Sequence, residues 1–301
     1  MKEILYVERL TQEVCREKVY GDLFLRLLYG TGWMSRLVAP FLLPLIATIP
    51  FFSHMYGWLQ RRWWSRYKIR RFIDKYHIDE REFLKPISHF ASFDAFFTRA
   101  LTSAARPLAQ GEDVVILPAD GRYLVFSNMQ EVEKFWIKSR PFDIEALLQN
   151  RELALHYAGG SMVIARLAPV DYHRFHFPCD AIPEEPRCIP GPLYSVNPKA
   201  LKKNIAILWE NKREIVMLHT KRFGSIACIA VGATYVGTIH HTFTPKKLHA
   251  KGQEMGYFSF GGSSLVLLFE QGKIVFDRDL VANTKNGLET RGLMGQSLGK
   301  L

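Results

Sequence analysis

The sequence predicts an α+β protein in which a helical N-terminal region precedes a β-rich, mostly antiparallel core. Between Phe72 and Phe97, aromatic and aliphatic residues recur at intervals near three or four, which is the spacing of amphipathic helices. From about Val114 onward, short β-branched and aromatic runs are separated by Gly, Pro and Asp, as in antiparallel strands joined by turns. We therefore expect a helical region over residues 1–107 and a β-rich domain over residues 108–301.

Composition narrows the class of partner. The chain has 301 residues, 48% of them hydrophobic, and a formal net charge of +11, so it can bury a core and attract an anionic partner. Nucleic acid and anionic lipid are the obvious candidates. Cys15, Cys179, Cys188 and Cys228 are too scattered for a zinc site or a disulfide framework, so we expect reduced thiols and no metal. Charges in the first residues, MKEILYVERL, rule out the apolar core of a signal peptide and favour a cytosolic start.

An uncharged stretch is followed by a basic aromatic one. Residues 37–60 contain no Lys, Arg, Asp or Glu and are about long enough to span a bilayer. Pro40, Pro44 and Pro50 oppose a straight spanning helix. Residues 61–71, RRWWSRYKIRR, combine six basic side chains with aromatic rings that favour the lipid headgroup zone. We expect in-plane insertion at an anionic membrane surface and no nucleic-acid binding; a transmembrane helix and a buried core segment remain as alternatives.

Three segments carry residues suited to chemistry. Asp120 lies in LPADGRY, where Asp-Gly alone is an ordinary turn signal. His173 and His176 lie three residues apart in DYHRFHF, where neutral imidazoles can act as acid or base. Ser263 follows two glycines that interrupt a strand-like run, and such glycines indicate a bulge or a tight bend. His240 has a histidine neighbour, but adjacent residues on a strand face opposite ways, so only one of the two could join a site.

An aspartate, a histidine and a serine from separate segments could form the charge relay of a serine hydrolase. Ser263, however, lacks a GxSxG elbow and is followed by strand-like SLVLLFE instead of a helix. A serine in a glycine-flanked bend is better placed to attack its own chain than an external acyl group. A lipid-acting serine hydrolase and a non-enzymatic, basic membrane-binding protein remain as alternatives.

From about Phe93 to its end, the chain resembles the phosphatidylserine decarboxylase family, a pyruvoyl-dependent group. The N-terminal hundred residues resemble the longer bacterial type of that family in general character. The resemblance is carried by collinear segments: FDAFFTR, Arg106–Pro107, PADG, DYHRFH, LYSVN, VGATYVG, KGQEMGYF and the Gly-Ser-Ser element. It implies a sandwich- or barrel-like catalytic core behind a membrane-associating N-terminal region.

The resemblance also implies self-cleavage between Gly262 and Ser263, with Ser263 converted to a covalent pyruvoyl cofactor. Asp120, His176 and Ser263 match the family residues of the self-cleavage relay, and His173 matches the histidine associated with proton handling during decarboxylation. The cut would leave a heterodimer of a large chain, residues 1–262, and a small chain, residues 263–301.

The implied reaction converts phosphatidylserine to phosphatidylethanolamine and CO2 through a Schiff base on the pyruvoyl group. The implied location is peripheral or monotopic, at the cytoplasmic face of the cell membrane; a higher homo-oligomer stays open. The family's commonest cleavage element is Leu-Gly-Ser-Thr, whereas this chain has Gly261 at the Leu position and Ser264 at the Thr position. Ser264 therefore stays open as an alternative attacking residue.

Overall fold

The computed structural model describes residues 4–17, 35, 37, 50–129, 131–132, 142–233, 238–260 and 263–301. Four features of the sequence lie outside these residues in whole or in part. They are the leucine run at 23–28, most of the uncharged stretch before residue 50, residues 234–237 of VGATYVG, and the glycines Gly261 and Gly262.

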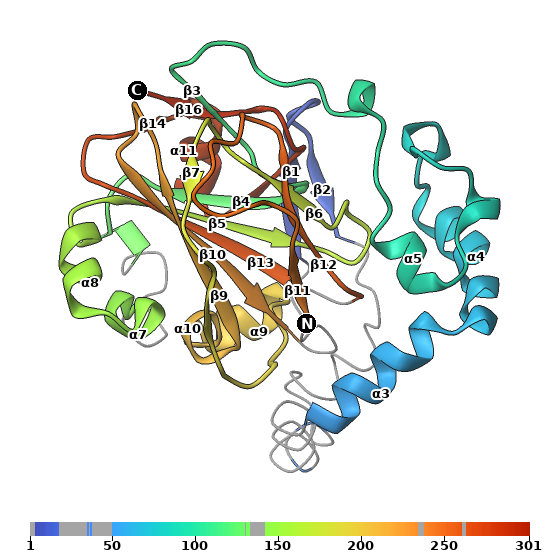
Figure 1. Cartoon of the computed structure of the whole chain (residues 1–301). Coiled ribbons are helices and arrows are strands. Elements are labelled where there is room, and N and C mark those ends of the chain that lie inside the picture. The colour runs from blue at the N-terminus through green and yellow to red at the C-terminus, as the bar shows by residue number, and fades with distance from the viewer. Residues whose placement is uncertain are drawn as a thin grey trace.

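A ten-stranded sheet forms the centre of the molecule (Figure 1). Its strands, in spatial order, are β2 (Val14–Arg16), β1 (Leu5–Glu8), β15 (Glu289–Gly292), β4 (Gly121–Phe126), β5 (Ser161–Leu167), β13 (Ser263–Phe269), β10 (Ser225–Gly232), β9 (Arg213–His219) and β7 (Ile182–Pro183), with β8 (Arg187–Ile189) also pairing with β9. Neighbouring strands are antiparallel except β1 and β15. Because the order of the described strands begins at β2 and ends at β7, the sheet is open, and the closed-barrel form of the expectation is wrong.

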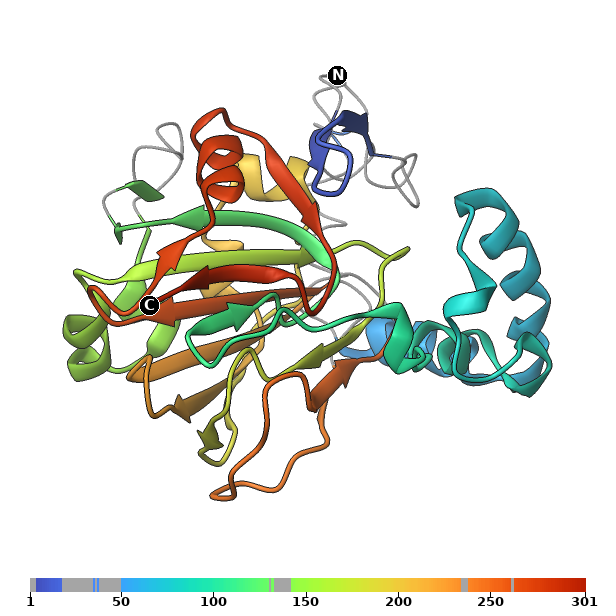
Figure 2. The ribbon, with the colours of Figure 1, turned by 90° about the horizontal axis from the view of Figure 1, so that it is seen from above.

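Two three-stranded sheets pack against one face of the central sheet (Figure 2). They are β11 (Ile239–His241), β12 (Glu254–Phe258) and β6 (Arg174–His176), and β14 (Val275–Phe276), β16 (Ser297–Lys300) and β3 (Val114–Ile116). Leu265 and Leu267 of β13 share a core here with Phe175 and Phe258 of the small sheets. The layered arrangement agrees with the mostly antiparallel α+β fold that the sequence predicted.

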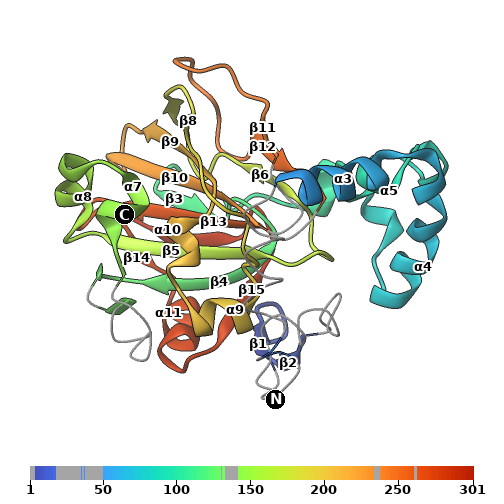
Figure 3. The ribbon, with the colours of Figure 1, turned by 90° about the horizontal axis from the view of Figure 1, so that it is seen from below.

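Short helices cover the opposite face (Figures 1 and 3). They are α7 (Ile144–Leu148), α8 (Arg151–Tyr157), α9 (Pro198–Lys203) and α10 (Ile207–Glu210); α11 (Arg278–Lys285) packs on β4. Val266 and Leu268 of β13 share this second core with Leu147 and Leu201. Since side chains alternate along a strand, β13 is apolar beyond its first two residues because it has a core on each face.

A helical arm projects to one side of the sheets (Figures 1, 2 and 3). It contains α3 (Pro50–Arg61), α4 (Tyr67–Tyr76), α5 (Phe93–Phe97) and the 3₁₀ turns η1 (Trp63–Arg66), η2 (Glu80–Glu82), η3 (Ile87–His89) and η4 (Ser103–Ala105). Phe83 and Phe90 follow 3₁₀ turns instead of lying in a long helix, yet they join one aromatic core with α4 and α5. No helix among the described residues has both the length and the apolar character needed to cross a bilayer.

The first described residues depart from the helix predicted for this region. β1 and β2 form an antiparallel hairpin whose first strand pairs in parallel with β15, 280 or so residues later in the chain. Local spacing could not reveal this strand because its partner, Glu289–Gly292, is so distant in sequence. The hairpin therefore belongs to the sheet, not to the helical arm.

Candidate active site

Ser263 is the first residue of β13 and is fully buried between two neighbouring strands. It lies opposite Leu167 of β5 and Gly232 of β10. Its exposed fraction is 0%, and its Oγ has no hydrogen-bond partner among the described residues. A buried hydroxyl without a partner is costly, and in a native protein such a group often has a chemical role. Only the serine side of the predicted cleavage bond can be described, since Gly262 lies outside the described residues.

Strand alternation separates the two serines that follow the glycines. Ser263 is in phase with Leu265 and Leu267, which face the small sheets, whereas Ser264 is in phase with Val266, which faces the helices. One of the small sheets holds the second half of DYHRFH, because β6 comprises Arg174–His176, and His173 directly precedes that strand. Ser263 is therefore the serine on the histidine side of the sheet.

His173 lies at the end of the loop that leaves β5. Its Nε2–H donates to the carbonyl of Ala168 at 3.1 Å, its Nδ1 has no partner among the described residues, and its ring stacks on Phe97 with centroids 3.9 Å apart. Burial lowers its pKa to about 3, with Asp171 acting in the opposite direction. Since Ala168 directly follows the residue paired with Ser263, this loop brings a neutral imidazole to the serine end of the strand.

His176 has both ring nitrogens occupied. Its Nδ1–H donates to the Gly252 carbonyl at 2.9 Å, and the Tyr172 hydroxyl donates to Nε2 at 3.0 Å. Burial lowers its pKa, while the Gly252 carbonyl and the charges of Glu254 and Asp120 act in the opposite direction. The ring is therefore neutral and held in one tautomer.

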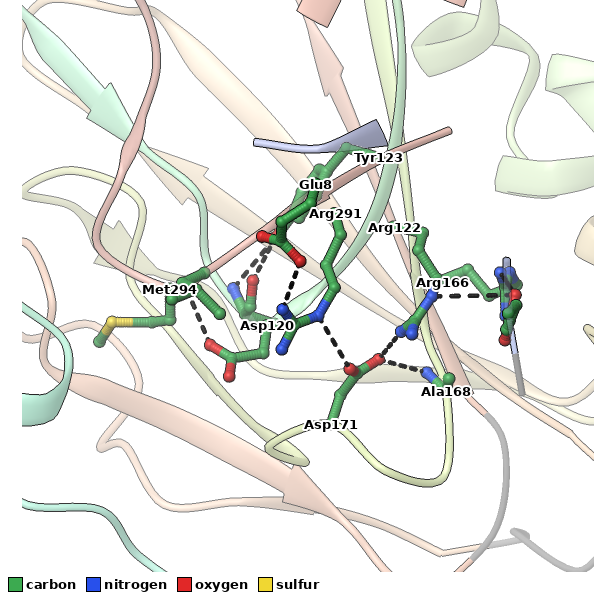
Figure 4. A network of polar contacts seen from close by, with 12 residues as sticks. Glu8, Asp120, Arg122, Tyr123, Arg166, Ala168, Asp171, Arg291 and Met294 are labelled. Atoms are coloured by element: carbon green, nitrogen blue, oxygen red, sulfur yellow. Dashed lines mark hydrogen bonds and ion pairs between the residues drawn. The ribbon is translucent and has the colours of Figure 1, made fainter. Parts of the chain in front are cut away.

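Asp120 sits in the bend just before β4 and is ion-paired with an arginine. Arg106 donates to its carboxylate at 2.8 and 2.6 Å. The Met294 N–H donates to the same carboxylate at 2.9 Å (Figure 4). The next residue is Gly121, and the space there favours glycine, since a Cβ would lie only 3.0 Å from the Arg166 carbonyl oxygen. Among the described residues, no hydrogen bond joins Asp120 to His176; the structure places the two in one neighbourhood but gives each its own partners.

The chain is similar to named proteins over its whole length. Residues 93–300 match the family model for phosphatidylserine decarboxylase. The phosphatidylserine decarboxylase proenzyme of Chlamydia pneumoniae is 47% identical over 300 residues, which cover 100% of this chain and 98% of the relative. The chain belongs to the phosphatidylserine decarboxylase family. Proenzymes of the same name from Chlamydia trachomatis serovar L2 and Chlamydia felis are each 46% identical and cover 99% and 100% of this chain and 98% and 99% of the relatives.

This family member also holds its histidine loop with residues that the sequence reasoning missed. Asp171 accepts from the Ala168 N–H at 2.7 Å and from the Arg122 guanidinium, and its other oxygen lies 4.0 Å from Arg291 Nε (Figure 4). These contacts fix the loop that ends at His173. The sequence offered one signal for this role, the carboxylate at the start of DYHRFH. It could not show the partners of Asp171, because Arg122 and Arg291 lie on strands far away in the sequence.

A second missed residue, Asp94, holds the segment before the glycines. Its carboxylate accepts from the Phe260 N–H at 3.0 Å. The Phe260 ring packs on Phe93 and Phe97, with centroids 5.2 and 4.8 Å away, and joins the aromatic core of the arm from the sheet domain. The arm of this decarboxylase-family chain therefore holds Phe260, three positions before Ser263, by one hydrogen bond and by ring packing. The signal was Asp94 within FDAFFTR, a segment to which no role had been given.

Proposed function

We propose that the chain decarboxylates phosphatidylserine to phosphatidylethanolamine and CO2, using a pyruvoyl group that it makes from Ser263 by cutting the Gly262–Ser263 bond. Membership of the family and the relatives' name, proenzyme, support both the reaction and a maturation step. The observation that carries the proposal is the Ser263 hydroxyl, which is fully buried on the histidine face of β13 and has no hydrogen-bond partner among the described residues. The Ser264 hydroxyl is also buried without such a partner, but it lies in phase with Val266 on the helix face.

The cut would begin with transfer of the Ser263 hydroxyl proton to His176 and attack of the oxygen on the Gly262 carbonyl. His176 Nε2 carries a lone pair because its proton is on Nδ1, bonded to Gly252. For this step the ring must exchange its bond from Tyr172 for one to Ser263, and the charge of Asp120 would stabilise the imidazolium that forms.

Attack converts the amide to an ester. Elimination across Ser263 then releases the Gly262 carboxylate, and hydrolysis of the remaining dehydroalanine releases ammonia. The fold suits this product. After the cut, β13 would still be paired with β5 on one side and β10 on the other, so residue 263 would keep its place. When present, the pyruvoyl group supplies a carbonyl that condenses with the substrate amine and accepts the electron pair left by CO2.

His173 is the proposed proton donor to the carbon that loses CO2. Its Nδ1, which has no partner among the described residues, would take up the proton that the substrate ammonium releases and pass it to that carbon. Its loop reaches the start of β13, and the Ala168 carbonyl and the Phe97 ring fix its orientation. Its surroundings exclude water, because its exposed fraction is 0%. A dry site protects the carbanion-like centre from other proton sources and strengthens local electrostatics.

Membrane association is part of the proposal. Aromatic side chains stand out from the arm near its basic residues: Trp63 is 76% exposed and Tyr67 61%, and Trp58 and Trp64 are both 40% or more exposed. Arg61, Arg62, Arg66, Arg70 and Arg71 occupy the same stretch and are exposed or partly exposed. Rings of this kind favour the interface, and the cations attract anionic lipid. We place the enzyme as a peripheral or monotopic protein at the cytoplasmic face of the cell membrane.

Intact mass spectrometry tests the proposal. Matured protein should contain two chains, the smaller beginning at position 263 without a free amine, and should release CO2 from phosphatidylserine vesicles. Ser263→Ala should stay uncut and inactive, whereas Ser264→Ala, the matched control on the opposite face, should still be cut. A lipid-acting serine hydrolase or a membrane-binding scaffold predicts one chain of 34.7 kDa. Active protein that retains an intact Ser263 would refute the pyruvoyl route.

A further inference from the structure

Arg99, the last residue of FDAFFTR, is a buried cation whose donors the protein leaves largely unused. It is 4% exposed, and its Nε is buried without a hydrogen-bond partner. Its guanidinium makes one long contact, 3.4 Å from Nη1 to the Phe96 carbonyl, and no ion pair with any carboxylate in the part of the chain described. The guanidinium carbon lies 4.8 and 5.2 Å from the ring centroids of Phe96 and Phe83, which hold the side chain in place.

The other buried arginines that the structure describes are paired. Arg106, Arg122 and Arg166 each bind at least one carboxylate. Arg213, like Arg99, has no carboxylate, but its three nitrogens donate to the backbone carbonyls of Leu147, Asn211 and Ala146. Arg122 Nε is also buried without a hydrogen-bond partner, but the charge of Arg122 is paired with Asp171. Each of these four arginines therefore has a carboxylate partner or three backbone acceptors among the described residues, and Arg99 has neither.

The Arg99 side chain remains charged at neutral pH. Burial lowers its pKa to about 10, and the charges of Asp120, Asp171 and Glu82, none of which forms an ion pair with it, only partly offset this. A buried cation without a paired anion is unfavourable, so a ligand anion that completes its hydrogen bonds would be bound strongly.

An anion bound to Arg99 would lie close to the candidate active site, because the segment that ends at Arg99 contacts the histidine segment. Two residues earlier, the Phe97 ring stacks on His173, and the charge of Arg99 is close enough to contribute to the lowered pKa of that histidine. Between them, the Thr98 carbonyl is fixed by a 2.9 Å bond from Arg174. Arg99 therefore lies two residues from the ring that stacks on His173, the residue proposed to protonate the substrate.

Phosphatidylserine offers two anions, and the reaction distinguishes them. A cation paired with the carboxylate would stabilise the group that must lose its charge as CO2 leaves, which raises the barrier. A cation paired with the phosphodiester meets the same charge in the substrate, the transition state and the product. We propose that Arg99 binds the phosphodiester of the aminophospholipid headgroup, a role that rests on the proposed function.

Kinetics of the matured Arg99→Met enzyme test this role. Loss of a charge-assisted contact should raise KM for phosphatidylserine about 10-fold or more, with a much smaller change in kcat, because the contact is the same in ground and transition states. Glycerophosphoethanolamine, which has a phosphodiester and no carboxylate, should lose inhibition by a similar factor. Inhibition by L-serine, which has a carboxylate and no phosphate, should not change. Arg99→Lys should fall between the wild type and Arg99→Met.

Other outcomes overturn the proposal without touching the function itself, which wild-type decarboxylation tests separately. If L-serine inhibition weakens and phosphodiester inhibition does not, Arg99 binds the carboxylate. Arg213→Met is the control for a structural arginine, since it leaves three carbonyls without donors and should lower Tm strongly. Should Arg99→Met lower Tm as much, should neither inhibitor respond, or should both Arg99 variants remain uncut, Arg99 serves the fold or the cut and not the lipid.

Discussion

The Glu17 carboxylate ties the N-terminal hairpin to the central sheet, and Glu17→Gln removes its charge while keeping its size. Arg166 donates to the two carboxylate oxygens at 3.1 and 2.6 Å, and Arg122 Nε lies 3.8 Å away. The Glu17 and Arg166 side chains are 5% and 3% exposed. On its other side Arg166 binds Glu289 at 2.7 Å, so one guanidinium joins a carboxylate from each of the two proposed chains.

The magnitude follows from burial. Breaking a buried ion pair costs about 3–5 kcal/mol when one charge is left without a partner. Arg166 keeps Glu289 here, and the glutamine oxygen can still accept one hydrogen bond, so we expect a loss of about 2–4 kcal/mol. For a domain of this size that corresponds to a fall in Tm of about 4–10 °C.

The pH dependence of this effect has a definite sign. Burial alone would raise the pKa of Glu17, but the charges of Arg166 and Arg122 outweigh it and lower the pKa below the ordinary 4.5. A carboxyl with a lowered pKa in the folded state contributes stability above its unfolded pKa, and loses it as pH falls through the folded value. The Tm difference between wild type and Glu17→Gln should therefore be full at pH 7 and shrink steadily below about pH 4.5.

Thermal melts of the purified protein at pH 7 and over the acid range measure both features. Glu13→Gln on the same hairpin is the matched control, because Glu13 is exposed and should change stability by less than about 0.5 kcal/mol. Equal Tm values for wild type and Glu17→Gln at pH 7, or a difference that grows on acidification, would refute the assignment of this pair as a buried, stabilising link.

Three further substitutions address the site and the arm. His173→Ala should be cut normally but turn over phosphatidylserine at least 10-fold more slowly, as expected for loss of a positioned acid; uncut protein would mean that the two histidines have exchanged roles. Asp94→Ala should slow the cut on a time-resolved gel, because the Phe260 N–H loses its acceptor; an unchanged rate would count against Asp94 as a positioning residue. Trp63→Ser should weaken sedimentation with anionic vesicles and leave the cut intact, and unchanged sedimentation would exclude this ring from the membrane contact.

Some of the site could be predicted from sequence because its signals are local. Asp120, the histidine pair and Ser263 each lie in a short segment with a recognisable pattern, and the strand-like runs that follow Asp120 and include Ser263 do form β4 and β13. The partners of these residues could not be predicted in the same way. Asp120 meets Met294 across 174 positions, and His176 meets Gly252 across 76, so both contacts depend on the pairing of strands that are far apart in the sequence.

The helical arm shows the same division. The spacing of its phenylalanines correctly indicated burial, because Phe72 of α4 and the three phenylalanines of α5 share one core. It did not indicate that Phe260 completes that core from the sheet domain, or that the preceding hairpin leaves the arm and joins β15. Periodicity reports which residues are buried, whereas the identity of the burying partner is set by topology.

The pKa of His173 links the proposed substrate contact to the proposed proton transfer. Burial lowers that pKa to about 3, Asp171 opposes the shift and Arg99 adds to it, so the free ring is neutral at pH 7 and is poorly prepared to give up a proton. A phosphodiester on Arg99 would cancel the charge that adds to the shift, and would raise the pKa of His173 only when substrate is bound. Histidine NMR of the wild-type protein should show this rise with glycerophosphoethanolamine, and Arg99→Met should start higher and not respond. If the pKa of His173 in the wild-type protein does not change with the ligand, phosphodiester binding by Arg99 and proton transfer by His173 are not linked. The proton would then come from another group.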